Sequence, residues 1–268
     1  MNTVKFTFKD GKNKALTMSY DDGIFQDKRL IEIFNKHGIK GSFHINGGLF
    51  GAVHKHPRLF AEEIKDVYAG HEVSCHGYTH PFLEKLAPME VVHEMLDDKK
   101  ALEDACGYVV RGMSYPFGTY SDEVISIISK LGINYARTVV STGKFNIPED
   151  FMRWHATCHH NDKNLMTYLE NLKNSTRDLQ LMYVWGHAYE FDDNNNWEII
   201  EKFCEEAGGD PDIWYATNIE IFDYVTAMRR CELSADRTML YNPSAVSVWV
   251  RAEGKTVECK GGVMTKLN

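Results

Sequence analysis

The sequence lacks the cysteine spacing of a disulfide framework or of a zinc knuckle. Its six cysteines, at positions 75, 106, 158, 204, 231 and 259, contain no CxxC pair, which predicts reduced thiols within a core. The sequence also lacks an excess of positive charge, because its formal net charge is -8. Such a surface disfavours nucleic acids and anionic membranes as partners, and an uncharged small molecule or a glycan suits it better.

No apolar run approaches the length of a membrane span, and the opening stretch MNTVKFTFKDGKNKAL has no apolar core of signal-peptide length. On this ground we expect a cytoplasmic protein. Internal repeats and low-complexity linkers are also missing, while 43% of the 268 residues are hydrophobic. This content supports one large core and therefore one main domain.

Short apolar runs alternate with amphipathic stretches over most of the chain. The apolar runs predict strands at 15–19, 41–45, 72–75, 109–114, 134–139, 154–158 and 181–185. The amphipathic stretches predict helices at 28–37, 57–69, 88–105, 121–131, 163–174 and 197–207. Strands that alternate with helices run parallel and carry the helices outside, which indicates an α/β barrel or a doubly wound sheet.

The pattern changes after about Arg230. The stretch SAVSVWVRAEGKTVEC alternates with period two around an EGK turn, which predicts a β-hairpin. We therefore divide the chain into residues 1–230, the α/β body, and residues 231–268, a short β extension. We expect this extension to pack on the barrel or on a partner subunit and to take no part in the chemistry.

Polar side chains gather where the predicted strands end. Asp21 and Asp22 follow the first strand, His76 and His80 the third, the stretch SYPFGTY the fourth, and His187 the seventh. The reacting groups of such folds lie at the carboxyl ends of the strands, where the loops begin. The coincidence of four clusters at one edge therefore predicts a single site.

The stretch CHGYTHP has the character of a metal-binding turn. His76 and His80 enclose Gly77 and precede Pro81, so the backbone must turn and can bring both imidazoles to about 2.0 Å from an ion. Asp22 supplies a third ligand. Two histidines and one carboxylate leave a coordination position open, which is typical of catalytic rather than structural zinc.

A second HxxxH pair competes with the first. His155 and His159 occupy a predicted strand, where residues four apart share a face but lie roughly 13 Å from each other. This separation is too large for both to bind one ion, so we do not predict a metal site there.

The motifs SYDDG, HGYTHP, YPFG and WGH, in this order and approximate spacing, resemble those of the polysaccharide deacetylases, the NodB-homology carbohydrate esterases of family 4. The resemblance extends over roughly residues 14 to 220. It implies a distorted (β/α) barrel of the NodB-homology type. It also implies metal-dependent removal of an acetyl group from an N-acetylated sugar of a polysaccharide or oligosaccharide.

The resemblance also implies a role for each polar residue. Asp21 is the general base, Asp22, His76 and His80 hold the metal, and His187 is the general acid. The cofactor is then one divalent ion, with zinc favoured by the ligand types and cobalt or nickel as alternatives. In this scheme the cation keeps Asp22 ionised, while Asp21 stays free to accept a proton from water.

Residues around the third motif are expected to contact the substrate or the oxyanion. These residues are Tyr115, Pro116, Phe117, Arg137 and Trp154. The resemblance implies that a backbone N–H near Phe117 helps to stabilise the oxyanion. Trp154 either forms a wall of the acetyl pocket or belongs to the core.

The third motif departs from the family pattern, which has an arginine two residues before the proline to orient the base. Ser114 occupies this place. Arg111, Arg137 or Arg153 could replace the missing guanidinium. We favour Arg137, because it falls near the end of a predicted strand.

Three functions remain open from the sequence. The favoured one is a metal-dependent amide deacetylase that acts on an N-acetylated sugar, as a small molecule or an oligosaccharide. It has no nucleic-acid or membrane partner, and a homo-oligomer is left open. The second uses the same metal site on a non-sugar C–N bond, such as that of a cyclic imide or ureide. The third is a glycan-binding module with a relic site, and the intact set of acids and histidines argues against it.

Overall fold

The computed structural model describes residues 3–267 and contains a nine-stranded sheet in which every pairing is parallel. Its strands are β2 (Lys14–Asp21), β3 (Gly41–Ile45), β4 (Glu72–Cys75), β5 (Gly112–Ser114), β6 (Tyr135–Ser141), β7 (Trp154–Ala156), β8 (Cys158–His159), β9 (Gln180–Gly186) and β10 (Ile213–Tyr215). β2 is the central strand and pairs with β3, β9 and β10.

The sheet closes into a ring because residues 154–159 change their hydrogen-bonding partner. β7 pairs with β6 through Trp154, and β8 pairs with β9 through Cys158. Between the two, the Thr157 N–H donates to the carbonyl oxygen of Tyr183 at 2.8 Å. The ring therefore runs β2, β3, β4, β5, β6, β7–β8, β9 and back to β2, which confirms the predicted distorted (β/α) barrel.

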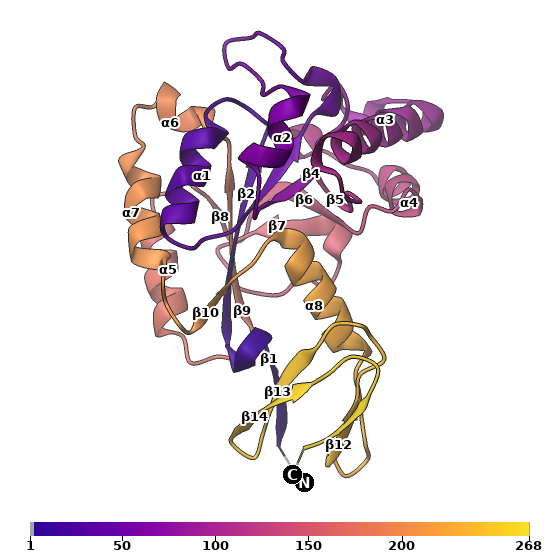
Figure 1. Ribbon diagram of the computed structural model, residues 1–268, viewed down its shortest axis with the longest axis vertical. Helices are drawn as coiled ribbons and strands as arrows, with labels where there is room; N and C mark the ends of the chain where they lie inside the picture. Colours follow the sequence, from indigo (N-terminus) through magenta and orange to yellow (C-terminus); the bar gives the residue numbers. More distant parts are fainter. Residues whose placement is uncertain (1–2, 268) are drawn as a thin grey trace.

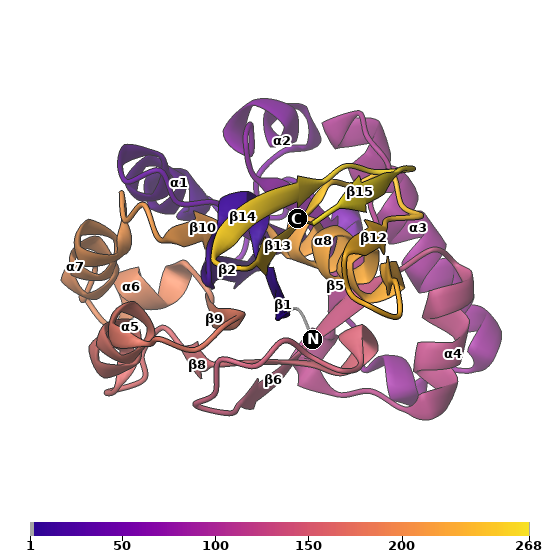
Figure 2. The same ribbon diagram turned by 90° about the horizontal axis from the view of Figure 1, so that it is seen from below.

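Helices surround this ring on its outer side, except that the last one lies against its lower end, where the Asn218 N–H donates to Ser42 Oγ at 2.7 Å (Figures 1 and 2). They are α1 (Asp27–Lys36), α2 (Ala61–Val67), α3 (Pro88–Cys106), α4 (Asp122–Lys130), α5 (Leu165–Asn174), α6 (Tyr189–Asp193), α7 (Glu198–Ala207) and α8 (Asn218–Arg230). Short 3-10 turns occupy Lys9–Gly11, Gly47–Leu49, Leu83–Lys85, Pro116–Gly118 and Phe151–Arg153. A capping side chain fixes where α4 begins: Ser121 Oγ accepts a hydrogen bond from the Val124 N–H at 3.2 Å.

The predicted elements agree with the structure except in a few segments. The strands 41–45 and 72–75 have the predicted bounds, whereas β10 and α8 were not predicted. The helix expected from residue 57 begins only at Ala61. The prediction for residues 57–60 was wrong because this segment pairs with the chain after β2: the Phe25 N–H donates to Pro57, and the Leu59 N–H donates to Gly23.

The interior of the barrel is polar towards the carboxyl ends of its strands and apolar towards α8, where Ala15, Leu181 and Tyr183 pack with Trp154. Met18 and Tyr20 of β2 belong to the apolar core that the strands share with the outer helices, whereas Ser19 and Asp21 between them are buried polar residues. Asp21 contacts Arg137 of β6, which is not a neighbouring strand, so these side chains meet inside the ring. Other buried polar side chains of the strands are Thr17, Ser42, His44, Glu72, Ser74 and Ser114.

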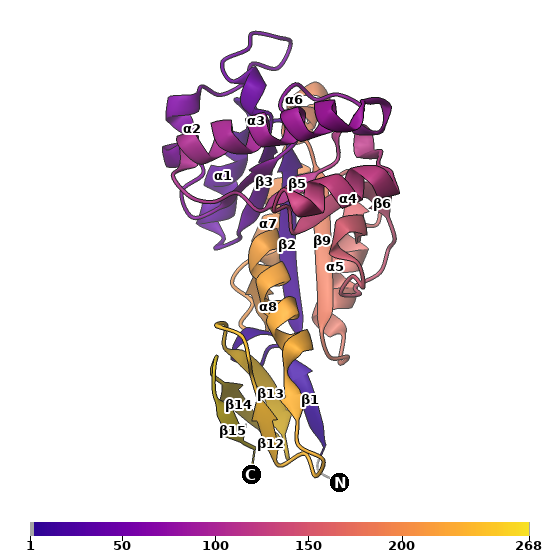
Figure 3. The ribbon, with the colours of Figure 1, turned by 90° about the vertical axis from the view of Figure 1, so that its right-hand side faces the viewer.

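The C-terminal part forms two small antiparallel sheets below the barrel (Figure 3). One contains β1 (Val4–Thr7), β13 (Val248–Ala252) and β14 (Lys255–Cys259), and the other contains β11 (Glu232–Leu233), β12 (Met239–Tyr241) and β15 (Met264–Lys266). β13 and β14 are the predicted hairpin around the EGK turn. Because β1 pairs with β13, the start of the chain is joined to this extension. The domain division at residue 230 stays a prediction.

Among residues 3–267, no helix combines the length and the apolar character that crossing a membrane requires. The expected cytoplasmic location stays a prediction.

A buried carboxylate opens α1. Asp27 is fully buried, and its Oδ2 accepts a hydrogen bond from the Tyr68 hydroxyl at 2.6 Å and from the Ile24 N–H at 3.3 Å. Its Oδ1 has no partner within the described part of the chain. Burial raises the pKa of Asp27 to about 8.

We expect this carboxyl to destabilise the fold at alkaline pH. An acid whose pKa is higher in the folded state loses stability as the pH rises from its unfolded value of 3.8 towards its folded value of about 8. Asp27→Asn removes this titration. The melting temperature of the variant relative to that of the parent protein should therefore be higher at about pH 9 than at about pH 5. Thermal unfolding at both pH values measures the difference, with the exposed Asp66→Asn as the control. A difference that does not change with pH would contradict the assignment.

Candidate active site

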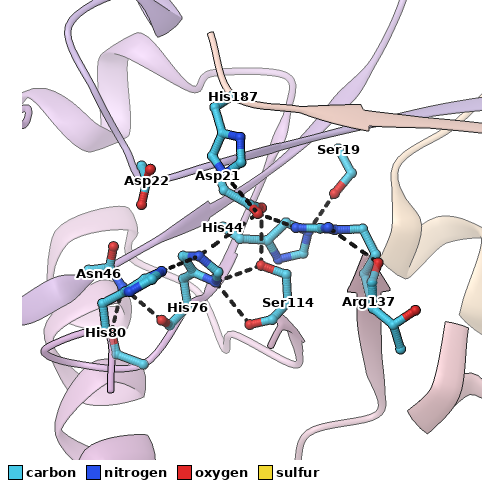
Figure 4. Close-up of polar contacts among 12 residues, drawn as sticks. Ser19, Asp21, Asp22, His44, Asn46, His76, His80, Ser114, Arg137 and His187 are labelled. Carbon is cyan, nitrogen blue, oxygen red and sulfur yellow. Dashed lines mark hydrogen bonds and ion pairs between the residues drawn. The ribbon is translucent and has the colours of Figure 1, made fainter. Parts of the chain in front are cut away.

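Four strands deliver polar side chains to the carboxyl edge of the barrel (Figure 4). β2 ends at Asp21, β4 leads into His76, β5 ends at Ser114 and β9 leads into His187. Because these strands are parallel, their ends meet at one edge, as the sequence predicted. His80 lies in the loop after β4.

Asp21 is the most enclosed acid of this group. Its side chain is 3% exposed, Ser114 Oγ donates to its Oδ1 at 3.0 Å, and the Arg137 guanidinium donates to its Oδ2. The Nε2 atoms of His76 and His187 lie 3.8 and 3.9 Å from the same Oδ2. Burial opposes ionisation, but Arg137 and His76 outweigh it and hold the pKa of Asp21 well below its usual range.

Asp22 points away from its neighbour because the backbone turns at this residue. Its φ of 90° lies in the left-handed region, which ends β2, and its N–H donates to the carbonyl oxygen of His44 at 2.8 Å. Arg58 Nη1 lies 3.0 Å from Asp22 Oδ1. Burial opposes ionisation of Asp22, but His76 and Arg58 outweigh it and lower the pKa of this carboxyl.

Asp22, His76 and His80 form a candidate metal centre. Each offers one ligand atom, and these atoms lie within 4.8 Å of one another. The two Nε2 atoms of the histidines are 3.1 Å apart. Two nitrogens that bind one zinc ion tetrahedrally at about 2.0–2.1 Å lie about 3.3–3.4 Å apart, so the spacing fits a shared ion.

The protonation of His76 also fits a metal ligand. Its Nδ1 lies 2.9 Å from the carbonyl oxygen of Ser114, which can only accept, so Nδ1 carries the proton and Nε2 keeps its lone pair. The turn after His76 is held by Asn46 Nδ2, which donates to the carbonyls of His76 and Gly77 at 2.7 Å each. Asp98 Oδ2 accepts from the His76 N–H at 2.9 Å. These residues fit one divalent cation.

His187 lies on the other side of Asp21 from the metal ligands (Figure 4). Its Nδ1 is 2.7 Å from Glu190 Oε1, three residues further along the chain. A carboxylate accepts at this distance, so Nδ1 is protonated and Nε2 is the atom that faces Asp21. Burial opposes protonation of the ring, but the hydrogen bond to Glu190 and the charge of Asp21 raise the pKa of His187 above its ordinary value.

Glu190 is at the centre of a second cluster of histidines. Its Oε2 lies 3.4 Å from His159 Nε2 and 3.2 Å from His160 Nε2, and it accepts from Asn161 Nδ2 at 2.9 Å. His159 Nδ1 accepts from the Asn161 N–H at 3.1 Å, so the proton of His159 is on Nε2. A protonated nitrogen cannot bind a cation. The cluster therefore fits a carboxylate surrounded by N–H donors better than a second metal site.

Arg137 is the arginine that contacts the predicted base. Of the three candidates, Arg111 pairs with Asp223 at 2.9 and 2.7 Å, and Arg153 pairs with surface aspartates. Arg137 is fully buried and reaches Asp21 from β6 across the interior. Ser114, in the place of the expected arginine, contacts the same carboxylate.

Pro116 and Phe117 lie beside the metal ligands. Phe117 has a φ of 57°, its ring is 50% exposed, and the ring centre is 4.5 Å from that of His80. Its N–H makes no hydrogen bond to the described residues. A Cβ on Gly77 would lie 3.2 Å from Pro116, which places the 3-10 turn against the loop that carries His80.

The side chains of Tyr115 and Trp154 do not reach the site. Tyr115 is 1% exposed, and its hydroxyl donates to the carbonyl oxygen of Met152 at 2.9 Å. Trp154 is also 1% exposed and packs edge-to-face on Tyr183 and Tyr135. It borders a cavity of about 380 Å³ that none of the predicted catalytic or metal-binding residues lines.

Sequence reasoning missed Glu190 and Arg58. A signal for Glu190 exists, because a carboxylate three residues after His187 shares its face once α6 begins. Arg58 carries no such signal, because its contact with Asp22 depends on a loop that the sequence predicted to be helical.

The fold and the site together define an α/β barrel in which a buried acid lies between a metal-type centre and a histidine. A family model described as polysaccharide deacetylase matches residues 8–136, which include Asp21, Asp22, His76 and His80. Over these residues the chain is similar to the polysaccharide deacetylase family. His187 and Glu190 lie outside the matched residues.

Two curated relatives carry names from this family. The chain is 29% identical over 114 residues to the peptidoglycan-N-acetylglucosamine deacetylase PgdA of Listeria monocytogenes serotype 1/2a, which covers 42% of this chain and 23% of PgdA. It is 28% identical over 123 residues to a chitooligosaccharide deacetylase of Bradyrhizobium sp., which covers 45% of this chain and 53% of the relative. The chain thus spans less than two thirds of the length of either relative.

A solved structure shares the fold over most of the chain. The putative polysaccharide deacetylase of Mycobacterium smegmatis is 17% identical, with a TM-score of 0.61 over 85% of this chain and 96% of that one. At this identity the likeness shows a common fold.

The two adjacent acids should respond differently to substitution. Asp22→Asn replaces a predicted metal ligand and should lower the bound metal per chain, whereas Asp21→Asn should keep the metal and lose most turnover. Elemental analysis of both purified variants, with turnover measured after metal loading, tests this division. Equal metal loss in both variants would contradict it.

Proposed function

We propose that this chain is a metal-dependent amide hydrolase that removes the acetyl group from an N-acetylated sugar of an oligosaccharide or polysaccharide. The observation that carries the proposal is the position of Asp21. This ionised carboxylate lies between the three proposed metal ligands and His187. Its Oδ2 is 3.8 Å from Nε2 of His76, one of these ligands, and 3.9 Å from Nε2 of His187. The similarity to a peptidoglycan-N-acetylglucosamine deacetylase and to a chitooligosaccharide deacetylase supports a sugar amide as the substrate.

Asp22, His76 and His80 would hold the cation. When bound, such an ion polarises the amide carbonyl and lowers the pKa of an attacking water. We propose zinc, because two imidazoles and one carboxylate with an open position are typical of catalytic zinc, while cobalt and nickel accept the same ligands.

Asp21 acts as the general base. Its carboxylate takes a proton from the attacking water, and both of its oxygens are held in place, Oδ1 by Ser114 and Oδ2 by Arg137. Arg137, on β6, thereby orients the base, which in the family pattern is the function of an arginine at the position of Ser114. The fixed orientation matters because proton transfer requires a base within hydrogen-bonding reach of its target.

His187 acts as the general acid. Its Nε2 gives a proton to the leaving amine. Its Nδ1 stays protonated and donates a hydrogen bond to Glu190. Glu190 favours the imidazolium that must exist before this step. The N–H of Phe117 is a candidate donor to the oxyanion, because it has no partner among the described residues and lies beside His80.

Release of acetate from an oligomer of N-acetylglucosamine tests the proposed function. The zinc-loaded protein should release acetate, lose this activity with a chelator and regain it when zinc is restored. Ureides and cyclic imides, assayed in parallel, test the alternative C–N substrates. Turnover of these compounds without acetate release from any sugar would replace the proposal with that alternative.

Replacement of His187 should separate amide from ester cleavage. His187→Ala should lower the rate on an N-acetylated sugar by about 10²- to 10⁴-fold, the usual contribution of general acid catalysis. An activated aryl acetate should be affected much less, because its leaving group departs without a proton. The two rates are compared in one metal-loaded preparation.

An exposed histidine remote from the acids, His93→Ala, serves as the control for this measurement. If His187→Ala slows the amide and the aryl ester equally at unchanged metal content, His187 is not the acid for the leaving group.

A further inference from the structure

The loop before α2 extends over the metal-binding edge of the barrel, at the top of the view in Figure 1. It contains the stretch HKHPR, residues 54–58. The base of this stretch is fixed to the end of β2: the Phe25 N–H donates to the Pro57 carbonyl at 2.9 Å, and the Leu59 N–H donates to Gly23 at 3.0 Å. The loop also closes on itself, since the Arg58 N–H donates to the carbonyl of Ala52 at 3.1 Å.

A cavity of about 230 Å³ lies between this loop and the metal ligand Asp22. Its other lining residues are Ile24, His54, Lys55, His56, Arg58 and Tyr189. This volume is below the roughly 300–1,000 Å³ of sites for drug-sized ligands, which suits a single sugar ring. The cavity is therefore placed to receive the sugar next to the one whose acetyl group lies at the metal.

One wall of the cavity is a stacked ring pair. The ring centres of His56 and Tyr189 are 4.3 Å apart with an angle of 17° between their planes. Tyr189 in turn lies 5.1 Å from His187, the proposed acid. A pyranose ring presents apolar C–H faces that pack on such rings while its hydroxyls stay free for hydrogen bonds.

The other wall carries two basic side chains, each paired with an aspartate, in a protein with a net charge of -8, and the aspartate that pairs with Lys55 also lies 3.3 Å from His56 Nε2. Lys55 Nζ lies 2.7 Å from Asp193 and is 74% exposed. Arg58 contacts Asp22 through Nη1, and its Nε and Nη2 make no hydrogen bond to residues 3–267. When a cation occupies the metal centre, it takes up the charge of Asp22, so the guanidinium keeps its charge and free donors for a ligand in the cavity.

We infer that this cavity binds a sugar that bears a carboxylate, so that the substrate is an acidic glycan with a hexuronic acid next to the N-acetylated residue. The inference rests on the proposed function for the deacetylated sugar. Arg58 offers a planar pair of donors that matches a carboxylate, Lys55 adds a second positive charge, and the His56–Tyr189 pair supports the ring. Lys55, His56 and Arg58 are then specificity-determining residues.

The test compares two tetrasaccharides of equal length. One alternates N-acetylglucosamine with glucuronic acid, and the other contains N-acetylglucosamine alone. The kcat/KM for acetate release should be at least about tenfold higher for the acidic one at low salt. The preference should shrink as the ionic strength rises, because salt screens the partly exposed charges.

Substitution of Lys55 gives a matched comparison. Lys55→Ala should reduce the preference for the acidic tetrasaccharide by about threefold, and Lys55→Glu should reduce it further. The control is Lys100→Ala, because Lys100 is also 74% exposed and also pairs with an aspartate, Asp104, at 2.5 Å. His56→Ala should weaken the binding of both tetrasaccharides, because it removes one ring of the stacked pair.

Binding separates this inference from the proposed function. Calorimetry in an Asp21→Asn background gives the Kd of each tetrasaccharide without turnover. Tighter binding of the acidic tetrasaccharide that Lys55→Ala weakens supports the cavity assignment, even if neither sugar releases acetate and the proposed function fails. Equal Kd values for the two tetrasaccharides, or equal weakening of both by Lys55→Ala, overturn the assignment of a carboxylate-binding cavity.

Discussion

The buried contact between Arg137 and Asp21 is the interaction on which the site depends. It joins β6 to β2 across the interior of the ring, and both side chains are almost completely enclosed. Removal of one partner from such a pair leaves an uncompensated buried charge, which typically costs about 3–5 kcal/mol. The arginine therefore contributes to the fold and to the proposed chemistry together, because the same contact orients the proposed base and stabilises its ionised form.

This contact accounts for the polar end of the barrel interior, towards the carboxyl ends of the strands. Asp21 needs partners, and an inward position supplies one, because Ser114 Oγ donates to it at 3.0 Å. His44 and Ser19, two further inward residues, contact each other at 2.9 Å. Apolar residues of the strands pack outward against the helices, and a second apolar cluster, which includes Ala15, Trp154 and Tyr183, fills the interior towards α8. The barrel thus combines hydrogen bonds near the site with hydrophobic packing outside the ring and at its other end.

The sequence predicted the elements that local patterns determine. Strand and helix periodicity and the turn residues of CHGYTHP were sufficient for β3, β4 and the positions of His76 and His80. What could not be predicted depends on contacts between distant segments. The choice of Arg137 among three arginines follows from which strand faces Asp21 across the ring, and the contact of Arg58 with Asp22 follows from a loop fixed by backbone hydrogen bonds to residues 23–25. Tyr115 and Trp154 were expected at the site because sequence position does not reveal the direction of a side chain.

The change of partner at Thr157 forms a seam in the ring, and the catalytic groups are distributed unevenly around it. Arg137 belongs to the strand on one side of the seam and His187 follows the strand on the other, while Asp22 and His76 lie on the opposite arc. A local opening of the ring at this point would separate His187, the proposed acid, from Arg137, which holds the proposed base. The proposed metal ligands would not be disturbed. A form that is partly unfolded at this seam would keep the proposed metal ligands together and lose the proposed acid and the support of the base, so the metal content alone would not measure how much of the protein is competent.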